Sequence, residues 1–291
     1  MIYINKMRSR ITKKINTVNL QYYNTKDFRI GMIIPVTSRK RNYKDVKDTD
    51  FYKILLTSFI ETYNRSGKYR YNFYLGYDDD DLFFRENIEN MKRIFHKVTD
   101  NRMGFFMIEM KNLQGKVGQI WSNLARTASK DCDYLYQIGD DIQIISTGWE
   151  DVFVKDLLEK GNIGVTGPYD TNQKNMLTQS FVHVTHLQIF GDYYPKEIDN
   201  WFIDNWITFI YKPTKHRNIK VKNSGGPPRY KPTINKNVVV KIVKNSRIIL
   251  EEYLKSLDLE TVVYKSDTET HYVSENKRYL GSNRVLKSTI R

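Results

Sequence analysis

Two kinds of apolar pattern follow one another in turn along the first half of the chain. Runs rich in apolar and aromatic residues predict buried strands, and they cover residues 29–34, 69–75, 104–110 and 132–142. Between these runs, apolar side chains at helical spacing predict helices that begin near Asp50, Leu82 and Val117. Pro35 predicts the end of the first strand, because proline cannot donate to a ladder. The predicted order is strand, helix, strand, helix, strand, helix, strand.

This order indicates an α/β fold, with a mostly parallel central sheet flanked by helices. Parallel strands bring their carboxyl ends to one edge, where ligands of such sheets bind. Polar clusters follow three of the predicted strands, at residues 37–39, 78–81 and 139–141. We expect these clusters to become neighbours and to form a binding site.

The second half of the chain is less regular. Residues 148–160 predict a helix, and residues 162–166 predict a fifth strand that Gly167-Pro168 closes. Later segments predict a helix, a short strand, a turn-rich linker and a terminal helix, over residues 199–211, 219–221, 224–230 and 238–258. Residues 1–28 form a basic arm with weak periodicity, and the tail from Val262 is polar.

Composition narrows the class of protein. The chain has 291 residues, enough for one large domain with a substantial core. Its single cysteine, Cys132, excludes an internal disulfide framework and a cysteine-only zinc site. No apolar run approaches membrane-spanning length, and the N-terminus lacks a signal-peptide core. We therefore expect a soluble, cytoplasmic protein without a membrane anchor.

The net charge of +14 suggests an anionic partner. No Asp or Glu occurs between Asn205 and Leu250, and Lys212, Lys215, Arg217 and Arg229 in that span are candidate phosphate contacts. A solvated basic surface explains the same residues. The chain has no recognisable nucleic-acid motif, and its acidic strand ends argue against one basic face, so we do not expect nucleic acid as the partner.

Two local features carry candidate chemistry. The run 133–142 ends in the adjacent carboxylates Asp140 and Asp141, and oxygen ligands of this kind hold hard divalent cations. An ordinary Asp-rich turn explains the same residues. Around Lys116, Gly115 and Gly118 indicate a loop that opens a helix, and the free N–H groups of a helix N-terminus suit phosphate.

The chain resembles the GT-A fold glycosyltransferases, the nucleotide-diphosphosugar transferases, and within them a poorly characterised GT-A-like lineage. Residues 29–211 carry the resemblance, through the segments 33–37, 76–80, 139–141, 164–168, 179–183 and 201–206. The resemblance implies a catalytic domain over 29–230, with a nucleotide-binding half over 29–142 and an acceptor-side half over 143–230. Residues 1–28 and 231–291 are then an N-terminal arm and a C-terminal helix with its tail.

The same resemblance implies an activity. A sugar would move from a UDP- or GDP-sugar to a hydroxyl group of a glycan, protein or lipid-linked acceptor, with Mn²⁺ or Mg²⁺ bound and inversion favoured. Asp204 corresponds to the general base and Asp141 to the metal ligand, with His216 as a possible second ligand. The nucleotide-sugar contacts would come from Pro35, Thr37, Arg39, Asp78, Asp79, Lys116, Asn123 and Asp140, and the acceptor contacts from Trp201 and His183.

One departure from the family pattern leaves alternatives open. Gly139 stands where the family's metal-binding Asp-x-Asp motif has its first aspartate. A catalytically inactive nucleotide-sugar-binding protein of the same fold therefore remains an alternative to the enzyme. A basic nucleic-acid-binding protein is the third class, and only the net charge supports it.

Overall fold

The computed structural model describes residues 23–24, 26–173, 176–211, 214–224 and 234–256. Its centre is one eight-stranded sheet with the strand order β3-β2-β1-β4-β7-β6-β8-β5. The strands are β1 (Phe28–Val36), β2 (Tyr69–Asp78), β3 (Met103–Met110), β4 (Tyr134–Gln137), β5 (Ile142–Ile144), β6 (Thr166–Asp170), β7 (Ser180–His183) and β8 (Thr214–Asn223). The predicted basic arm up to residue 22, Lys212, Arg229 and the tail beyond residue 256 lie outside the described residues.

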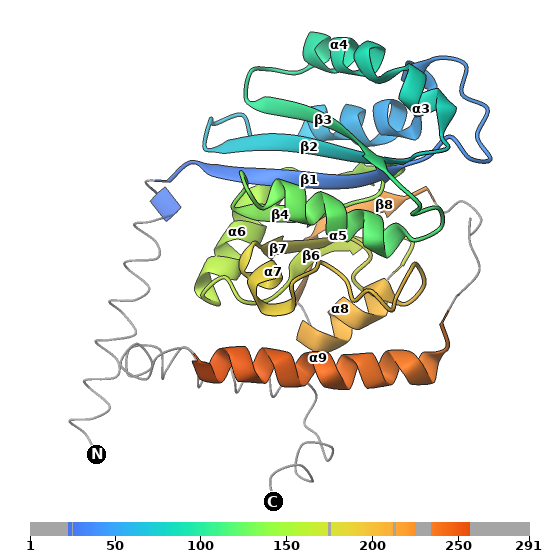
Figure 1. Cartoon of the computed structure of the whole chain (residues 1–291). Coiled ribbons are helices and arrows are strands. Elements are labelled where there is room, and N and C mark those ends of the chain that lie inside the picture. The colour runs from blue at the N-terminus through green and yellow to red at the C-terminus, as the bar shows by residue number, and fades with distance from the viewer. Residues whose placement is uncertain (1–22, 25, 174–175, 212–213, 225–233, 257–291) are drawn as a thin grey trace, which may run out of the picture.

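The sheet is mostly parallel, as the sequence predicts. β2 pairs with β1 and β3, and β1 pairs with β4, all in parallel. β7 is antiparallel to both β4 and β6, so β4 and β6 run in the same direction. The carboxyl ends of β1, β2, β4 and β6 therefore meet at one edge of the sheet, which lies to the right in Figure 1.

Helices cover both faces of this sheet (Figure 1). One face carries η1 (Val46–Asp48), η2 (Phe51–Leu56), α2 (Thr57–Thr62), α3 (Leu82–Glu86), α4 (Ile88–Val98) and α6 (Trp149–Glu159). The other carries α5 (Val117–Ala128), α7 (Thr185–Phe190), α8 (Ile203–Tyr211) and the outer helix α9 (Lys236–Ser256). No helix in the described ranges is long and apolar enough to cross a bilayer.

Alternation along the central strands builds the two cores. Met32 and Ile34 of β1 pack into the cluster under η2, α2 and α6, while Ile33 between them packs into the cluster under α5. A strand buried on both faces needs apolar side chains at nearly every position, and this is why the first strand is a continuous apolar run. The fold thus has three layers, with α9 adding a fourth beyond α8.

Four element boundaries differ from the predictions. β1 continues through Pro35, because pairing with β4 ends at Ile33 and the missing N–H of Pro35 faces no ladder partner. The predicted fourth strand is split by the 138–141 turn into β4 and β5. The predicted fifth strand is misplaced, because Asn162 and Gly164 have positive φ and β6 begins at Thr166. β8 extends well beyond the predicted 219–221.

Candidate functional site

Two polar clusters at the carboxyl edge are joined by Arg39. Its Nη2 donates to both carboxylate oxygens of Asp80, at 3.0 Å each, and lies 3.9 Å from Oδ2 of Asp78. These contacts connect the segment after β1 to the segment after β2. The clusters that follow the first two strands therefore form one surface, as the parallel register requires.

Asp78 differs from the other acids of its run. It is only 3% exposed, and its Oδ1 has no hydrogen-bond partner among the described residues. Burial raises the pKa of Asp78 to about 6, and the nearby Arg39 opposes this rise. A buried acceptor without a partner is costly unless a ligand supplies a donor. Asp78 Oδ1 is thus a buried acceptor whose hydrogen bond no described residue supplies.

Asp79 and Asp81 are instead engaged within the protein. Asp81 accepts from the Ser38 backbone N and from Ser38 Oγ, both at 2.7 Å, and from Thr37 Oγ1 at 3.3 Å. It also caps α3 through Phe84 N. Asp79 accepts from the backbone of Asn112 and from the side chain of Gln114. Both carboxylates shape the loops of the edge.

The 139–141 turn lies at the end of β4, against β7 and β8. Gln179 Oε1 accepts from Gly139 N at 3.1 Å, and Asp141 Oδ2 accepts from Ser224 Oγ at 2.7 Å. Asp140 is buried close to Tyr43, and its negative charge contributes to raising the pKa of that hydroxyl. A Cβ atom at position 139 would lie 3.0 Å from Asp141 Oδ1. Glycine therefore leaves room for the Asp141 carboxylate.

Asp140 and Asp141 are the two neighbouring carboxylates that would hold the metal that the resemblance implies. Within the described ranges, no three His, Cys, Asp or Glu side chains come together to hold a metal ion. His216 lies elsewhere: it pairs with Pro168, bonds Thr166 Oγ1 at 2.9 Å and is 3.6 Å from Asp156. The donor set fits a hard cation that takes one or two protein oxygens and the rest from phosphate and water.

Asp204 lies in the first turn of α8 and is half-buried. Its carboxylate makes no hydrogen bond to any residue that the structure describes. Burial raises the pKa of Asp204 to about 7, and the negative charge of Asp170 adds to the rise. Asp170 ends β6 and is held by Thr178 Oγ1 at 2.8 Å and by Asn172 N at 2.9 Å.

Two hydrogen bonds between loops bring the start of α8 to the same edge. Gly118 N donates to Asp199 O at 2.7 Å, and Asn200 Nδ2 donates to Gly115 O at 2.9 Å. The loop before α8 is thus fixed against the loop that opens α5. Lys116, the exposed N-cap residue of α5, lies in that second loop. Asp204 lies close enough to Asp170, the last residue of β6, for the charge of Asp170 to raise its pKa. Because β6 and β4 end at the same edge, Asp204 and the 139–141 turn both lie there.

Of the remaining predicted residues, Trp201 lies near Asp204, whereas Asn123 and His183 lie away from the carboxyl edge. Trp201, 41% exposed, lies in the loop just before α8. Asn123 lies in the middle of α5, away from the edge, and bonds Gln119 and Arg126. His183 ends β7 opposite Tyr134, at the other edge of the sheet, where burial lowers its pKa to about 4. Asn123, His183 and His216 are therefore not brought together with the other predicted residues.

Four residues of the edge were given no role from the sequence: Asp170, Gln179, Ser224 and Tyr43. Gln179 lies in a segment that carries the resemblance, and that segment is the one signal that pointed to it. The others reach the edge through strand pairings and loop contacts distant in sequence, so no local pattern marks them.

No protein-family model and no curated protein matches the sequence. Among solved structures, GalNAc-T7 with UDP, GalNAc and Mn²⁺ is similar, with a TM-score of 0.51 and 12% identity, over 83% of this chain and 55% of that one. S. aureus TarS is similar at TM-score 0.44 and 10% identity, over 87% of this chain and 49% of that one. Its 1-349 form in complex with UDP has a TM-score of 0.46 and 12% identity, over 88% of this chain and 73% of that one. The chain spans about half the length of full TarS and of GalNAc-T7. At such identities the similarity concerns the fold.

Proposed function

Since the chain has the GT-A-like glycosyltransferase fold, we propose that it transfers a sugar from a nucleoside-diphosphate sugar to a hydroxyl acceptor. A neighbour of the same fold, GalNAc-T7, was solved with UDP and Mn²⁺. The observation that carries the proposal is Asp204, a half-buried carboxylate whose pKa is raised to about 7 and which has no hydrogen-bond partner among the described residues.

Asp204 is the general base of this reaction. Its carboxylate takes the proton of the acceptor hydroxyl as the acceptor oxygen attacks the anomeric carbon, and the bond from that carbon to the diphosphate breaks. A base works best when its pKa is close to the working pH, and the pKa of Asp204 meets this requirement. Attack from the side opposite the leaving group inverts the anomeric configuration.

The nucleotide lies along the strand ends that precede the 139–141 turn. Asp78 Oδ1, which has no hydrogen-bond partner among the described residues, accepts a hydrogen bond from the base or ribose. Pro35, Thr37, Arg39 and Asp79 line the same segment, and Lys116 reaches from the start of α5. Either a UDP- or a GDP-sugar provides such donors.

Asp141, with Asp140 beside it, would hold Mn²⁺ or Mg²⁺, whose charge offsets the charge that builds on the departing diphosphate. The contact of Asp141 with Ser224 and the space left by Gly139 keep that carboxylate at the end of β4. The acceptor, a hydroxyl on a glycan, protein or lipid, approaches from the Trp201 side of Asp204.

The test compares donor binding with transfer. The full chain is incubated with Mn²⁺ and a panel of UDP- and GDP-sugars, and release of the nucleoside diphosphate is followed with and without sugar acceptors. We expect Asp204→Asn to lower the rate by about 10²- to 10⁴-fold while leaving nucleotide affinity unchanged. Asp131→Asn, on an exposed residue outside the site, is the control.

An Asp204→Asn protein as active as the wild type would refute the assigned base. Binding of nucleoside diphosphates without release from any donor would favour the inactive nucleotide-sugar-binding protein.

A further inference from the structure

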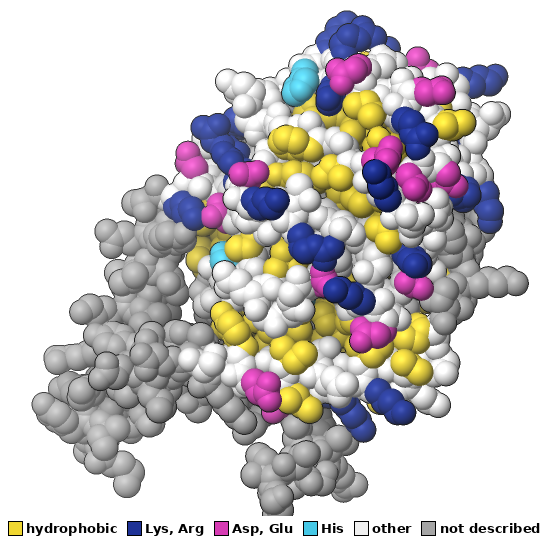
Figure 2. Space-filling view, viewed as in Figure 1, with side chains coloured by type: hydrophobic (Ala, Val, Ile, Leu, Met, Phe, Trp, Pro, Cys, Tyr) yellow, Lys and Arg dark blue, Asp and Glu magenta, His cyan; other side chains and the backbone are white. Residues whose placement is uncertain are grey.

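A cavity of about 740 Å³ lies between residues 190–197, α8 and α9. Its size is typical of small-molecule sites. Figure 2 shows apolar side chains gathered at this level of the molecule, just above the position of α9. The cavity is not the Asp204 site. It is lined by Trp206, which lies two residues after Asp204 on α8, is only 1% exposed and donates its ring N–H to Ser246 Oγ at 3.1 Å.

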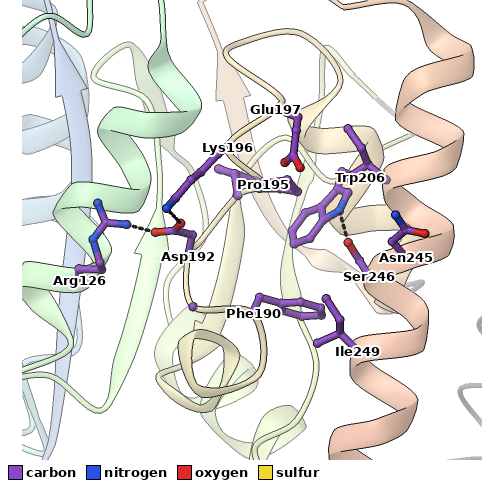
Figure 3. Close-up of a pocket in the computed structure, with 13 residues that line it drawn as sticks. Arg126, Phe190, Asp192, Pro195, Lys196, Glu197, Trp206, Asn245, Ser246 and Ile249 are labelled. Carbon is purple, nitrogen blue, oxygen red and sulfur yellow. Dashed lines mark hydrogen bonds and ion pairs between the residues drawn. The ribbon is translucent and has the colours of Figure 1, made fainter.

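The walls combine apolar surface with polar groups that remain available. Phe190 and Ile249 approach Trp206 from one side, and the Glu197 carboxylate lies above the Trp206 ring (Figure 3). Asn245 projects from α9 beside it (Figure 3). Within the described part of the chain, the side chains of Glu197 and Asn245 make no hydrogen bond.

The cations of the cavity are already paired. Asp192 lies between Arg126 and Lys196 and forms an ion pair with each (Figure 3). The charges of Arg126 and Lys196 are balanced by the carboxylates of Asp192 and Glu197, so the lining carries no net charge that would select an anionic ligand. The chemistry that remains is an aromatic and aliphatic surface flanked by a carboxylate and an amide. A neutral polyhydroxylated ring fits this set, with its C–H face on Phe190 and Ile249, above the buried Trp206, and its hydroxyls on Glu197 and Asn245.

We propose that this cavity binds a neutral sugar unit of the acceptor glycan, at a distance from the unit that receives the transferred sugar. The acceptor role rests on the proposed function. Trp206 and Asp204 are two residues apart on α8, so their side chains project about 200° apart, on opposite sides of a helix about 10 Å wide. An oligosaccharide of a few units therefore spans the two sites around the start of α8.

The rim of the cavity is also joined to the catalytic edge. Gln119 Nε2, in the first turn of α5, donates to Pro195 O at 3.4 Å. From Pro195 the chain runs through Asp199, whose carbonyl accepts from Gly118, to Asp204. A sugar bound at the rim therefore contacts the segment that positions the general base.

The experiment uses ¹⁵N-labelled full chain and follows the indole N–H signal of Trp206. The probes are neutral di- and trisaccharides of hexoses and N-acetylhexosamines, with inorganic phosphate as the anionic comparison. We expect at least one saccharide to shift the Trp206 signal in a saturable way. Phe190→Ala and Asn245→Leu should each weaken that binding by about tenfold or more. Ile248→Ala, on the same helix but with an exposed side chain outside the cavity, should leave it unchanged.

Asn245 is exposed, so its variant keeps the test independent of folding defects. No shift with any saccharide, equal weakening by Ile248→Ala, or a larger shift with phosphate would each overturn the proposal. A UDP titration monitored at the 139–141 turn separates this result from the proposed function. Sugar binding without UDP binding would remove the acceptor role, and UDP-sugar turnover without sugar binding would remove the cavity alone.

Discussion

Glu150 should make the stability of this protein fall as the pH rises. Its side chain, in the first turn of α6, is fully buried. Oε1 accepts from Asn64 N at 2.8 Å and from Tyr71 Oη at 2.7 Å, whereas Oε2 has no hydrogen-bond partner among the described residues. Burial raises the pKa of Glu150 from 4.5 to about 7. Hydrogen bonds from Tyr71 and Asn64 oppose the rise but do not cancel it.

The magnitude follows from linkage. A carboxyl group with a raised folded-state pKa binds its proton more tightly in the folded protein than in the unfolded chain. Below pH 4.5 the Glu150 carboxyl is protonated in both states, so its burial carries no ionisation cost there. Between pH 4.5 and about 7, the free energy of unfolding falls by about 1.4 kcal/mol for each unit that the pH rises. Ionised Glu150 therefore lowers the free energy of unfolding by about 3 kcal/mol above pH 7.

Glu150→Gln isolates this effect, because glutamine keeps the Oε1 acceptor and cannot ionise. The free energy of unfolding is measured by urea denaturation at pH 4, 6 and 8 for wild type and variant. We expect the variant to gain about 3 kcal/mol relative to the wild type between pH 4 and pH 8. Glu61→Gln, at an exposed position, should show no such gain. A difference in unfolding free energy between variant and wild type that is the same at all three pH values would show that Glu150 does not titrate with a raised pKa.

Three further predictions concern the candidate site. Transfer by the wild type should fall about tenfold per pH unit below pH 7, because Asp204 must be ionised to act as a base, and Asp204→Asn should abolish this dependence in the pH–rate profile. Gly139→Ala places a Cβ atom 3.0 Å from Asp141 Oδ1. It should weaken Mn²⁺-dependent UDP binding by about 1 to 3 kcal/mol in calorimetry, and unchanged affinity would contradict the crowding. Gln179→Ala leaves the Gly139 N–H without its acceptor and should lower the free energy of unfolding by about 1 to 3 kcal/mol.

The sequence predicts the parts of the fold that local pattern determines. β1 and most of β2 are buried on both faces, so their apolar-rich runs identify them without knowledge of the partner strands. The meeting of residues 37–39, 78–81 and 139–141 follows from parallel order alone. Asp204 is identified by resemblance alone. The structure adds that its carboxylate is half-buried and makes no hydrogen bond to a described residue.

The rest depends on contacts distant in sequence. Residues 162–166 resemble a strand, but the ladder begins at Thr166, where β8 provides the partner and holds Pro168 inside the sheet. β8 itself is rich in lysine, and only Ile219 and Val221 point to a strand. His183 lies at the opposite edge because β7 runs antiparallel to β4, a direction that no local pattern indicates.

The most direct test of the proposed nucleotide site is a structure of the full chain with UDP and Mn²⁺. We expect the diphosphate at the 139–141 turn, within reach of Asp141, and the nucleoside along the ends of β1 and β2, beside Asp78. Nucleotide bound elsewhere, or no nucleotide at this edge under saturating conditions, would contradict it.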